Sequence, residues 1–196
     1  MAGKDIGRTR VGILALQGDV SLHLDALADL GIDASPVKTP AQLRGLDGLI
    51  IPGGESTALL RLAEPLGMLQ AITSFAESGG SIFGTCAGAI LLAKKVTNPE
   101  QRSLGLIDIT IRRNSYGRQL DSAEKTGQAH RPLASREIPM TFIRAPRITA
   151  TGRGVKVLAS YQEEAVLVQQ GRFMASTFHP ELDTDHDIYK YWLNLD

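Results

Sequence analysis

The sequence predicts an α/β protein with a mostly parallel, mixed-edge sheet flanked by helices. Near-continuous apolar runs at Val11–Leu16, Leu49–Ile51 and Ser81–Phe83 are typical of strands that are buried on both faces. Each run ends at glycine or polar residues, and a segment with helical spacing of apolar residues follows it. This alternation predicts helices on both faces of the sheet and functional loops at the carboxyl ends of the strands.

The first half of the chain fits this pattern element by element. Gly31 is a good residue to end the first helix, and Ser56 is a candidate cap for a later one. A short strand is also expected at 34–38 and a weak helical turn at 42–44. The expected helices cover residues 22–30, 58–63, 66–77 and 87–95.

The second half has a different character. Leu106–Arg112 alternates isoleucine with polar residues, which predicts a half-buried strand. The turn at Gln170–Gly171 predicts a hairpin, and residues 117–138 are polar enough to predict a long loop. Further strands are expected at 140–143, 155–159, 165–169 and 173–178, with a terminal helix at 188–195.

The length of 196 residues suits one sizeable domain, expected over 11–196 after a flexible leader at 1–10. Lysine plus arginine and aspartate plus glutamate both number 21, so the formal net charge is zero. This balance argues against a nucleic-acid footprint and against a polybasic membrane surface. The single cysteine excludes a disulfide within the chain and a multi-cysteine zinc site, and it fits a reduced, cytoplasmic setting.

Residues Gly84-Thr85-Cys86-Ala87-Gly88 lie between an expected strand and an expected helix. Gly-x-Cys-x-Gly at such a junction is a nucleophile elbow with sulfur in place of the serine oxygen. The helix amino terminus behind the sulfur favours the thiolate. The alternative is that Cys86 is a small buried apolar residue in a glycine-rich turn, because free cysteines are commonly buried.

Among the four histidines only His179 has a structured catalytic context, in His179-Pro180-Glu181 after a strand. Pro180 keeps His179 out of the helical region, and residues two apart in an extended backbone point the same way. Glu181 can therefore orient the His179 ring, which supplies a base and an orienter for Cys86. The alternative is a strand-end histidine beside a solvated acid.

Gly53-Gly54 follows the third strand and is expected close to the elbow. Backbone N–H groups there and at Ala87 can stabilise an oxyanion, although the pattern leaves open which glycine donates. A plain turn with a helix cap is the alternative for Pro52–Ser56. A phosphate-binding loop is disfavoured because no P-loop lysine follows the glycines.

Six motifs occur in order along the chain: Leu14–Gly18, Pro52–Thr57, Gly84–Gly88, Arg113–Gln119, Phe142–Pro146 and His179–Leu182. Together they resemble one family, the glutaminase subunits of pyridoxal 5′-phosphate synthase, which are class I (triad) glutamine amidotransferases with a flavodoxin-like sheet. The resemblance runs from about Val11 to the terminal helix. The Arg113–Gln119 and Phe142–Pro146 motifs make it specific to this subfamily.

The resemblance implies hydrolysis of L-glutamine by Cys86, His179 and Glu181 through a γ-glutamyl thioester. The ammonia would pass to a separate synthase subunit in a hetero-oligomer that makes pyridoxal 5′-phosphate. No cofactor or metal is implied for this chain. The implied glutamine-binding residues are Gly54, Glu55, Ser56, Arg113, Ile143 and Arg144, the implied oxyanion donors are Gly54 and Ala87, and Gln17 is implied as partner contact or oxyanion support.

Some features leave alternatives open. Asp183 stands where the family pattern leads us to expect threonine, and the acidic run at 183–187 fits a first helical turn better than a metal site. A glutaminase that serves another synthase would keep the same triad. A cysteine hydrolase on a similar fold would not need Arg113 or Arg144, and a regulatory subunit would not need Cys86.

Overall fold

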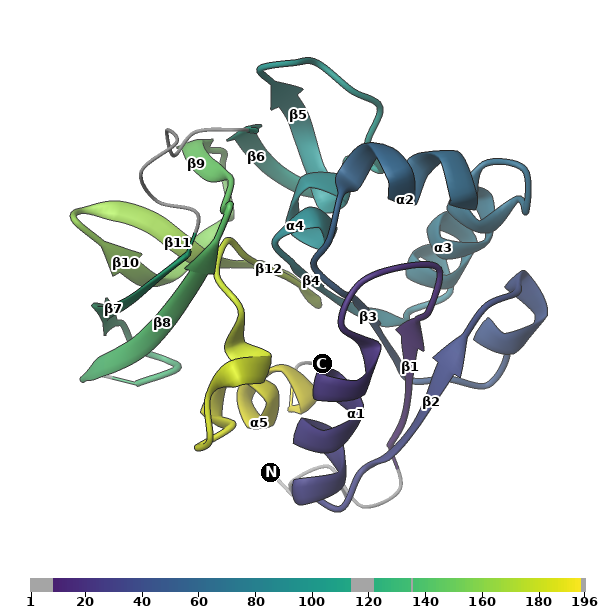
Figure 1. Cartoon of the computed structure of the whole chain (residues 1–196), viewed down its shortest axis with the longest axis horizontal. Helices are drawn as coiled ribbons and strands as arrows, with labels where there is room; N and C mark the ends of the chain where they lie inside the picture. Colours follow the sequence, from purple (N-terminus) through teal and green to yellow (C-terminus); the bar gives the residue numbers. More distant parts are fainter. Residues whose placement is uncertain (1–8, 114–121, 135, 195–196) are drawn as a thin grey trace.

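The computed structural model describes residues 9–113, 122–134 and 136–194, so most of the expected leader lies outside it. Within these residues nine strands form one large sheet (Figure 1). Their order across the sheet is β2 (Asp33–Val37), β1 (Arg10–Leu14), β3 (Gly48–Ile51), β4 (Ser81–Thr85), β12 (Phe173–Ser176), β11 (Glu164–Gln170), β10 (Lys156–Tyr161), β7 (Ser122–Ala129) and β8 (Glu137–Ile143).

The sheet has a parallel part and an antiparallel part, which confirms the mixed α/β fold predicted from the sequence. β2, β1, β3, β4 and β12 all pair in parallel, so their carboxyl ends meet at one edge. β12 also forms the predicted hairpin with β11, and the remaining pairs through β10 and β7 to β8 are antiparallel. The order of the parallel part is that of doubly wound flavodoxin-like sheets.

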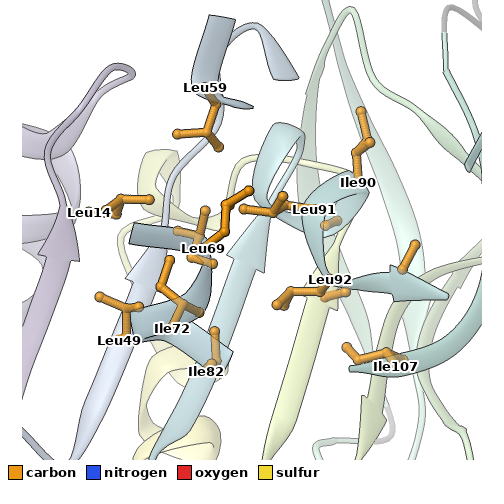
Figure 2. Packing of buried hydrophobic residues seen from close by; sticks show 14 of the residues in the cluster. Leu14, Leu49, Leu59, Leu69, Ile72, Ile82, Ile90, Leu91, Leu92 and Ile107 are labelled. Carbon is orange, nitrogen blue, oxygen red and sulfur yellow. The ribbon is translucent and has the colours of Figure 1, made fainter. Parts of the chain in front are cut away.

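Helices cover both faces of the parallel part (Figure 1). Successive strand residues face opposite sides, so Leu49 and Ile51 of β3 join one buried cluster and Ile50 joins the other. The first cluster packs against α2 (Ser56–Ala63), α3 (Met68–Glu77) and α4 (Ala87–Leu92), and Figure 2 shows its leucine and isoleucine side chains. The second packs against α1 (Val20–Asp29) and α5 (Asp187–Leu193).

A second sheet of three strands forms beside the first, from β5 (Ala93–Thr97), β6 (Ile107–Arg112) and β9 (Arg147–Thr151). The prediction of a helix through residue 95 was wrong at its end, because α4 stops at Leu92. Alanine and lysine favour helix, but β5 gains a parallel pairing with β6 and buries Ala93 and Val96.

The prediction of a loop over 117–138 was also wrong at Ser122–Ala129 and at 137–138, which are strands, whereas the described residues 130–134 and 136 lie in neither helix nor strand. β7 pairs with β8 from Ser122 to Gln128 in a continuous antiparallel register. Its residues have low strand propensity, so the pairing with β8 and β10 determines its conformation. Residues 114–121 lie outside the described part of the chain.

Two 3₁₀ turns complete the described fold, η2 (Pro40–Leu43) and η3 (Pro180–Leu182). No helix in the described residues is both long enough and apolar enough to cross a bilayer. Because β1, β3, β4 and β12 run in parallel, the loops that follow them gather at one edge of the sheet, where Gln17, Gly54, Cys86 and His179 lie.

Candidate active site

Cys86 occupies a sharp turn between the last residue of β4 and the first residue of α4. Its backbone has φ 48° and ψ −100°, an unfavourable conformation for a residue with a side chain. A hydrogen bond of 2.8 Å from the Cys86 N–H to the Ser176 carbonyl ties the turn to β12. This is the strained backbone of a nucleophile elbow, where the side chain stands at the carboxyl edge of the sheet.

Gly88 makes the tightness of the elbow possible. A Cβ at Gly88 would lie 2.0 Å from the Ile51 carbonyl oxygen, and one at Gly84 would lie 2.5 Å from the Gly88 carbonyl carbon. Any side chain at these positions would push α4 away from β3 or β4. Both glycines of the elbow motif are therefore explained by close backbone approach.

His179 and Glu181 form a buried pair behind the elbow. His179 Nδ1 lies 2.7 Å from Glu181 Oε1, and both side chains are buried. The route to this contact differs from the extended backbone that the sequence suggested. The chain turns at His179 with φ −105° and ψ 85°, and Pro180–Leu182 then forms the turn η3.

Gly53 lets the His179 ring lie beside the cysteine. A Cβ at Gly53 would lie 2.6 Å from His179 Cε1 and 3.4 Å from Cys86 Cβ. The ring, the cysteine and the end of β3 therefore adjoin one another. His179 Nε2 is buried and has no hydrogen-bond partner among the described residues, which leaves it available to a reacting group.

The electrostatics of the pair favour a charged histidine. Burial by itself lowers the pKa of His179, but interactions with the Cys86 sulfur and the Glu181 carboxylate outweigh it and raise the pKa to about 10. Burial alone raises the pKa of Glu181, but the hydrogen bond from His179 outweighs burial, so the pKa of Glu181 is lowered overall. His179 is therefore an imidazolium beside an ionised carboxylate near neutral pH.

Gln17 fixes the loop that follows β3. Its side-chain amide donates to the Glu55 carbonyl at 3.0 Å and accepts from the Glu55 N–H at 3.1 Å. The amide lies across Gly54, where φ is +135° and a Cβ would meet the Gln17 nitrogen at 2.7 Å. Gln17 thus fixes the two peptide units that flank Glu55, directly after the predicted oxyanion donor Gly54.

Glu55, not Ser56 as the sequence suggested, caps α2. Its carboxylate accepts hydrogen bonds from the N–H groups of Thr57 at 2.9 Å and Ala58 at 2.7 Å. Although burial raises the pKa of Glu55, these bonds lower it overall. Ser56 is buried, and its hydroxyl donates to Gln101 Oε1 at 3.0 Å.

The two predicted arginines follow strands of different sheets. Arg113 follows β6, and its Nη2 lies 2.8 Å from Thr57 Oγ1 and 3.4 Å from Glu55 Oε1. Arg144 follows β8, is exposed, and has a positive φ of 44°. Ile143 directly precedes it, and the Ile143 carbonyl oxygen lies 3.8 Å from Cys86 Sγ. The rest of the Arg113 motif, residues 114–119, is outside the described part of the chain.

Sequence reasoning missed the contacts that support these residues. Thr57 and Gln101 hold Arg113 and Ser56, and the buried His23 lies 3.6 Å from Glu181 Oε1 through its Nε2 atom. A signal for His23 existed, because it precedes Ala26 and Leu27 by three and four residues and so lies on the buried stripe of α1.

No cluster of three or more histidine, cysteine or acidic side chains in the described residues is placed to hold a metal ion. The acidic run at 183–187 instead contributes Asp185 and Asp187 to ion pairs with Arg136, and Asp187 begins α5.

A parallel α/β sheet that carries a cysteine on a nucleophile elbow beside a histidine and a carboxylate defines a class of elbow proteins capable of acyl chemistry. Comparison with known families narrows this class. Residues 13–195 match the model of the SNO glutamine amidotransferase family, and the chain belongs to that family.

Curated relatives extend over nearly the whole chain. A protein of Koribacter versatilis named pyridoxal 5′-phosphate synthase subunit PdxT is 47% identical, covering 95% of each chain. The protein of the same name from Thermotoga maritima is 44% identical, covering 95% of this chain and 98% of its own length. A crystal structure described as a glutamine amidotransferase superposes with a TM-score of 0.87 at 45% identity, over 93% of this chain and 96% of that one.

Replacement of Gly88 by alanine should destabilise the elbow strongly. The added methyl group would meet the Ile51 carbonyl, so we expect the free energy of unfolding to fall by about 3 kcal/mol or more in urea denaturation. Gly105→Ala is the control, since a Cβ there meets nothing within 4 Å. Its free energy of unfolding should fall by only about 1 kcal/mol, because alanine is disfavoured at this positive φ. Equal losses for the two variants would contradict the close approach.

His179 should contribute stability that is lost at alkaline pH. Its pKa is raised from 6.5 to about 10, so its contribution is complete below pH 6.5 and disappears as the pH rises to about 10. We expect His179→Gln to be less stable than wild type near pH 6, with the difference shrinking toward pH 10 in urea titrations. His130→Gln, which removes a histidine bonded to Ser160 instead, is the control for the loss of an imidazole elsewhere in the fold. A constant His179→Gln difference across this range would refute the assignment.

Proposed function

We propose that this chain is the glutaminase subunit of a pyridoxal 5′-phosphate synthase, which hydrolyses L-glutamine to L-glutamate and ammonia. The observation that carries the proposal is the strained Cys86 elbow beside the buried His179–Glu181 pair. Membership in the SNO glutamine amidotransferase family and the relatives named as synthase subunits support the substrate and the assembly.

The first half of the reaction forms a thioester. The Cys86 thiolate attacks the side-chain amide carbon of glutamine, and the carbonyl oxygen becomes an oxyanion. Ala87 is the first residue of α4, so its N–H has no acceptor within the helix and can donate to that oxygen, together with the N–H of Gly54. The His179 imidazolium then protonates the leaving nitrogen, and ammonia departs from the γ-glutamyl thioester.

The second half restores the enzyme. His179 is neutral after giving up its proton, so it can accept one from water as the water attacks the thioester carbonyl. The second tetrahedral intermediate collapses to glutamate and the Cys86 thiolate, and His179 ends as the imidazolium. Glu181 stays ionised throughout and holds the Nδ1 side of the ring, which directs Nε2 toward the reacting atoms.

Glutamine recognition is assigned to the loops around the elbow. Arg113 and Arg144 are proposed to bind the α-carboxylate, which suits the guanidinium fork, and the exposed Glu55 carboxylate to bind the α-ammonium group. Ile143 borders the sulfur through its carbonyl, and the backbone of Gly54 to Ser56 lines the opposite side. Under this assignment the glutamine side chain extends from the arginines toward Cys86.

The proposed partner is the synthase subunit, which would receive the ammonia within a hetero-oligomer and keep it from solvent. Gln17 lies at the carboxyl end of β1 and clamps the loop that carries Gly54, so contact with a partner there would act directly on the oxyanion donors. A cytoplasmic location is part of the proposal, in keeping with a single free cysteine and zero net charge.

Replacement of Cys86 by alanine should abolish glutaminase activity. Glutamate release from glutamine should be measured with and without the synthase subunit, and we expect the variant to lose at least about a thousandfold in kcat in the presence of the partner. Equal rates for wild type and Cys86→Ala would exclude the proposed nucleophile.

Replacement of Arg113 by lysine should weaken substrate binding more than turnover. Loss of the bidentate fork should raise the KM for glutamine by about tenfold while kcat stays within about threefold. Arg102→Lys is the matched control, since Arg102 forms only an exposed ion pair with Glu64 and should keep the wild-type KM. A KM for Arg113→Lys equal to that of the control would remove Arg113 from the glutamine site.

A further inference from the structure

His23 is a buried polar side chain that the proposed reaction does not use. It lies on α1 among apolar residues of the second core cluster, and its exposed fraction is 0%. Burial of an imidazole without partners is unfavourable, so each ring nitrogen requires a compensating contact. Those contacts lead directly to the candidate active site.

The two ring nitrogens of His23 face different elements. Nδ1 lies 2.6 Å from the hydroxyl oxygen of Tyr189 on α5. Nε2 lies 3.4 Å from Thr85 Oγ1, on the residue that precedes the nucleophile, and 3.6 Å from Glu181 Oε1. His23 thus connects α1 and α5 to the two segments that carry Cys86 and the orienting carboxylate.

Glu181 Oε1 is shared between two imidazole rings. The same oxygen that lies 3.6 Å from His23 Nε2 lies 2.7 Å from His179 Nδ1. Glu181 Oε2 is buried and has no hydrogen-bond partner among the described residues. Oε1 is the oxygen that both imidazole rings approach, so the orientation of the carboxylate depends on its contacts, and His23 is one of these.

The protonation states of the two histidines differ. Burial lowers the pKa of His23 and outweighs the nearby charges of Glu181 and Asp19, while His179 adds to the lowering. Burial also raises the pKa of Tyr189 well above its usual value, so its hydroxyl keeps a proton. A neutral ring that accepts that proton at Nδ1 carries its own hydrogen on Nε2, where it faces Glu181 and Thr85.

We propose that His23 is a positioning residue of the glutaminase site, whose Nε2–H, oriented by Tyr189, holds the Glu181 carboxylate against His179. This inference rests on the proposed function and names a further residue for the same reaction. A neutral donor suits the task, because it orients the carboxylate without supplying a competing positive charge. The full charge of Glu181 then remains available to the His179 imidazolium.

Two amide substitutions separate the contacts of the ring. The glutamine amide nitrogen lies near the position of Nε2, so His23→Gln keeps a neutral donor toward Glu181. The asparagine amide lies near Nδ1, so His23→Asn keeps the contact with Tyr189 and loses the one with Glu181. In the complex with the synthase subunit we expect kcat to fall about tenfold for His23→Asn and less than threefold for His23→Gln, with both KM values for glutamine near wild type.

A second measurement reports the reactivity of the Cys86 sulfur in the absence of catalysis. Cys86 is the single cysteine of the chain, so the rate of alkylation by iodoacetamide reports on this sulfur alone. Loss of the contact between His23 and Glu181 leaves the carboxylate less well oriented. The Cys86 thiolate and His179 imidazolium are then less well stabilised. We expect the pH midpoint of alkylation to rise in His23→Asn and to stay near wild type in His23→Gln. Tyr189→Phe, which frees the ring to change tautomer, should shift the midpoint in the same direction as His23→Asn.

Thermal unfolding of each variant, with His130→Asn as a histidine control outside this network, separates folding from positioning. Wild-type kcat and an unchanged alkylation profile in folded His23→Asn would overturn the proposal. Equal losses of kcat in His23→Asn and His23→Gln with unchanged alkylation profiles would also overturn it, since they indicate a packing role. Absence of glutamate release by the wild-type complex would instead refute the proposed function, while the alkylation profiles would still test the contact between His23 and Glu181.

Discussion

The close contact between the α4 backbone and the end of β3 is the constraint on which the rest of the site depends. Because Gly88 has no side chain, the helix starts directly against the Ile51 carbonyl, and Cys86 is forced into its positive-φ turn. The same contact brings the amino end of α4 and the loop after β3 close to Cys86. The strain at Cys86 is offset by the buried clusters on the two faces of the sheet.

The Glu181 carboxylate near the Cys86 sulfur is both buried and ionised. An ionised carboxylate away from water is costly unless its partners are well placed, and Glu181 meets one charged and one neutral imidazole at a single oxygen. These partners are His179, in the turn after β12, and His23 of α1, and α5 supports the second through Tyr189. Elements on the face away from α2 and α3 therefore determine the electrostatics at the carboxyl edge.

The sequence predicted the parallel strands, the elbow, the His179–Glu181 contact and the placement of Arg113 and Arg144 at strand ends, because each has a local pattern. β5 and β7 were missed because the alanine–lysine and polar sequences of these strands favour other states, and only pairing with β6, β8 and β10 makes them strands. His23 was passed over for a similar reason. Its spacing on α1 shows that it is buried, but its partners are 62 to 166 residues away in the chain.

The position of β12 in the sheet has a consequence for biosynthesis. This strand lies between β4 and β11, yet it is the last strand of the described chain to leave the ribosome. The parallel half and the antiparallel half can each begin to form earlier, but they cannot join until Ser176 has been made. His179, Glu181 and Tyr189 emerge later still, so the nascent chain carries the Cys86 thiol from residue 86 to residue 179 without the groups that activate it.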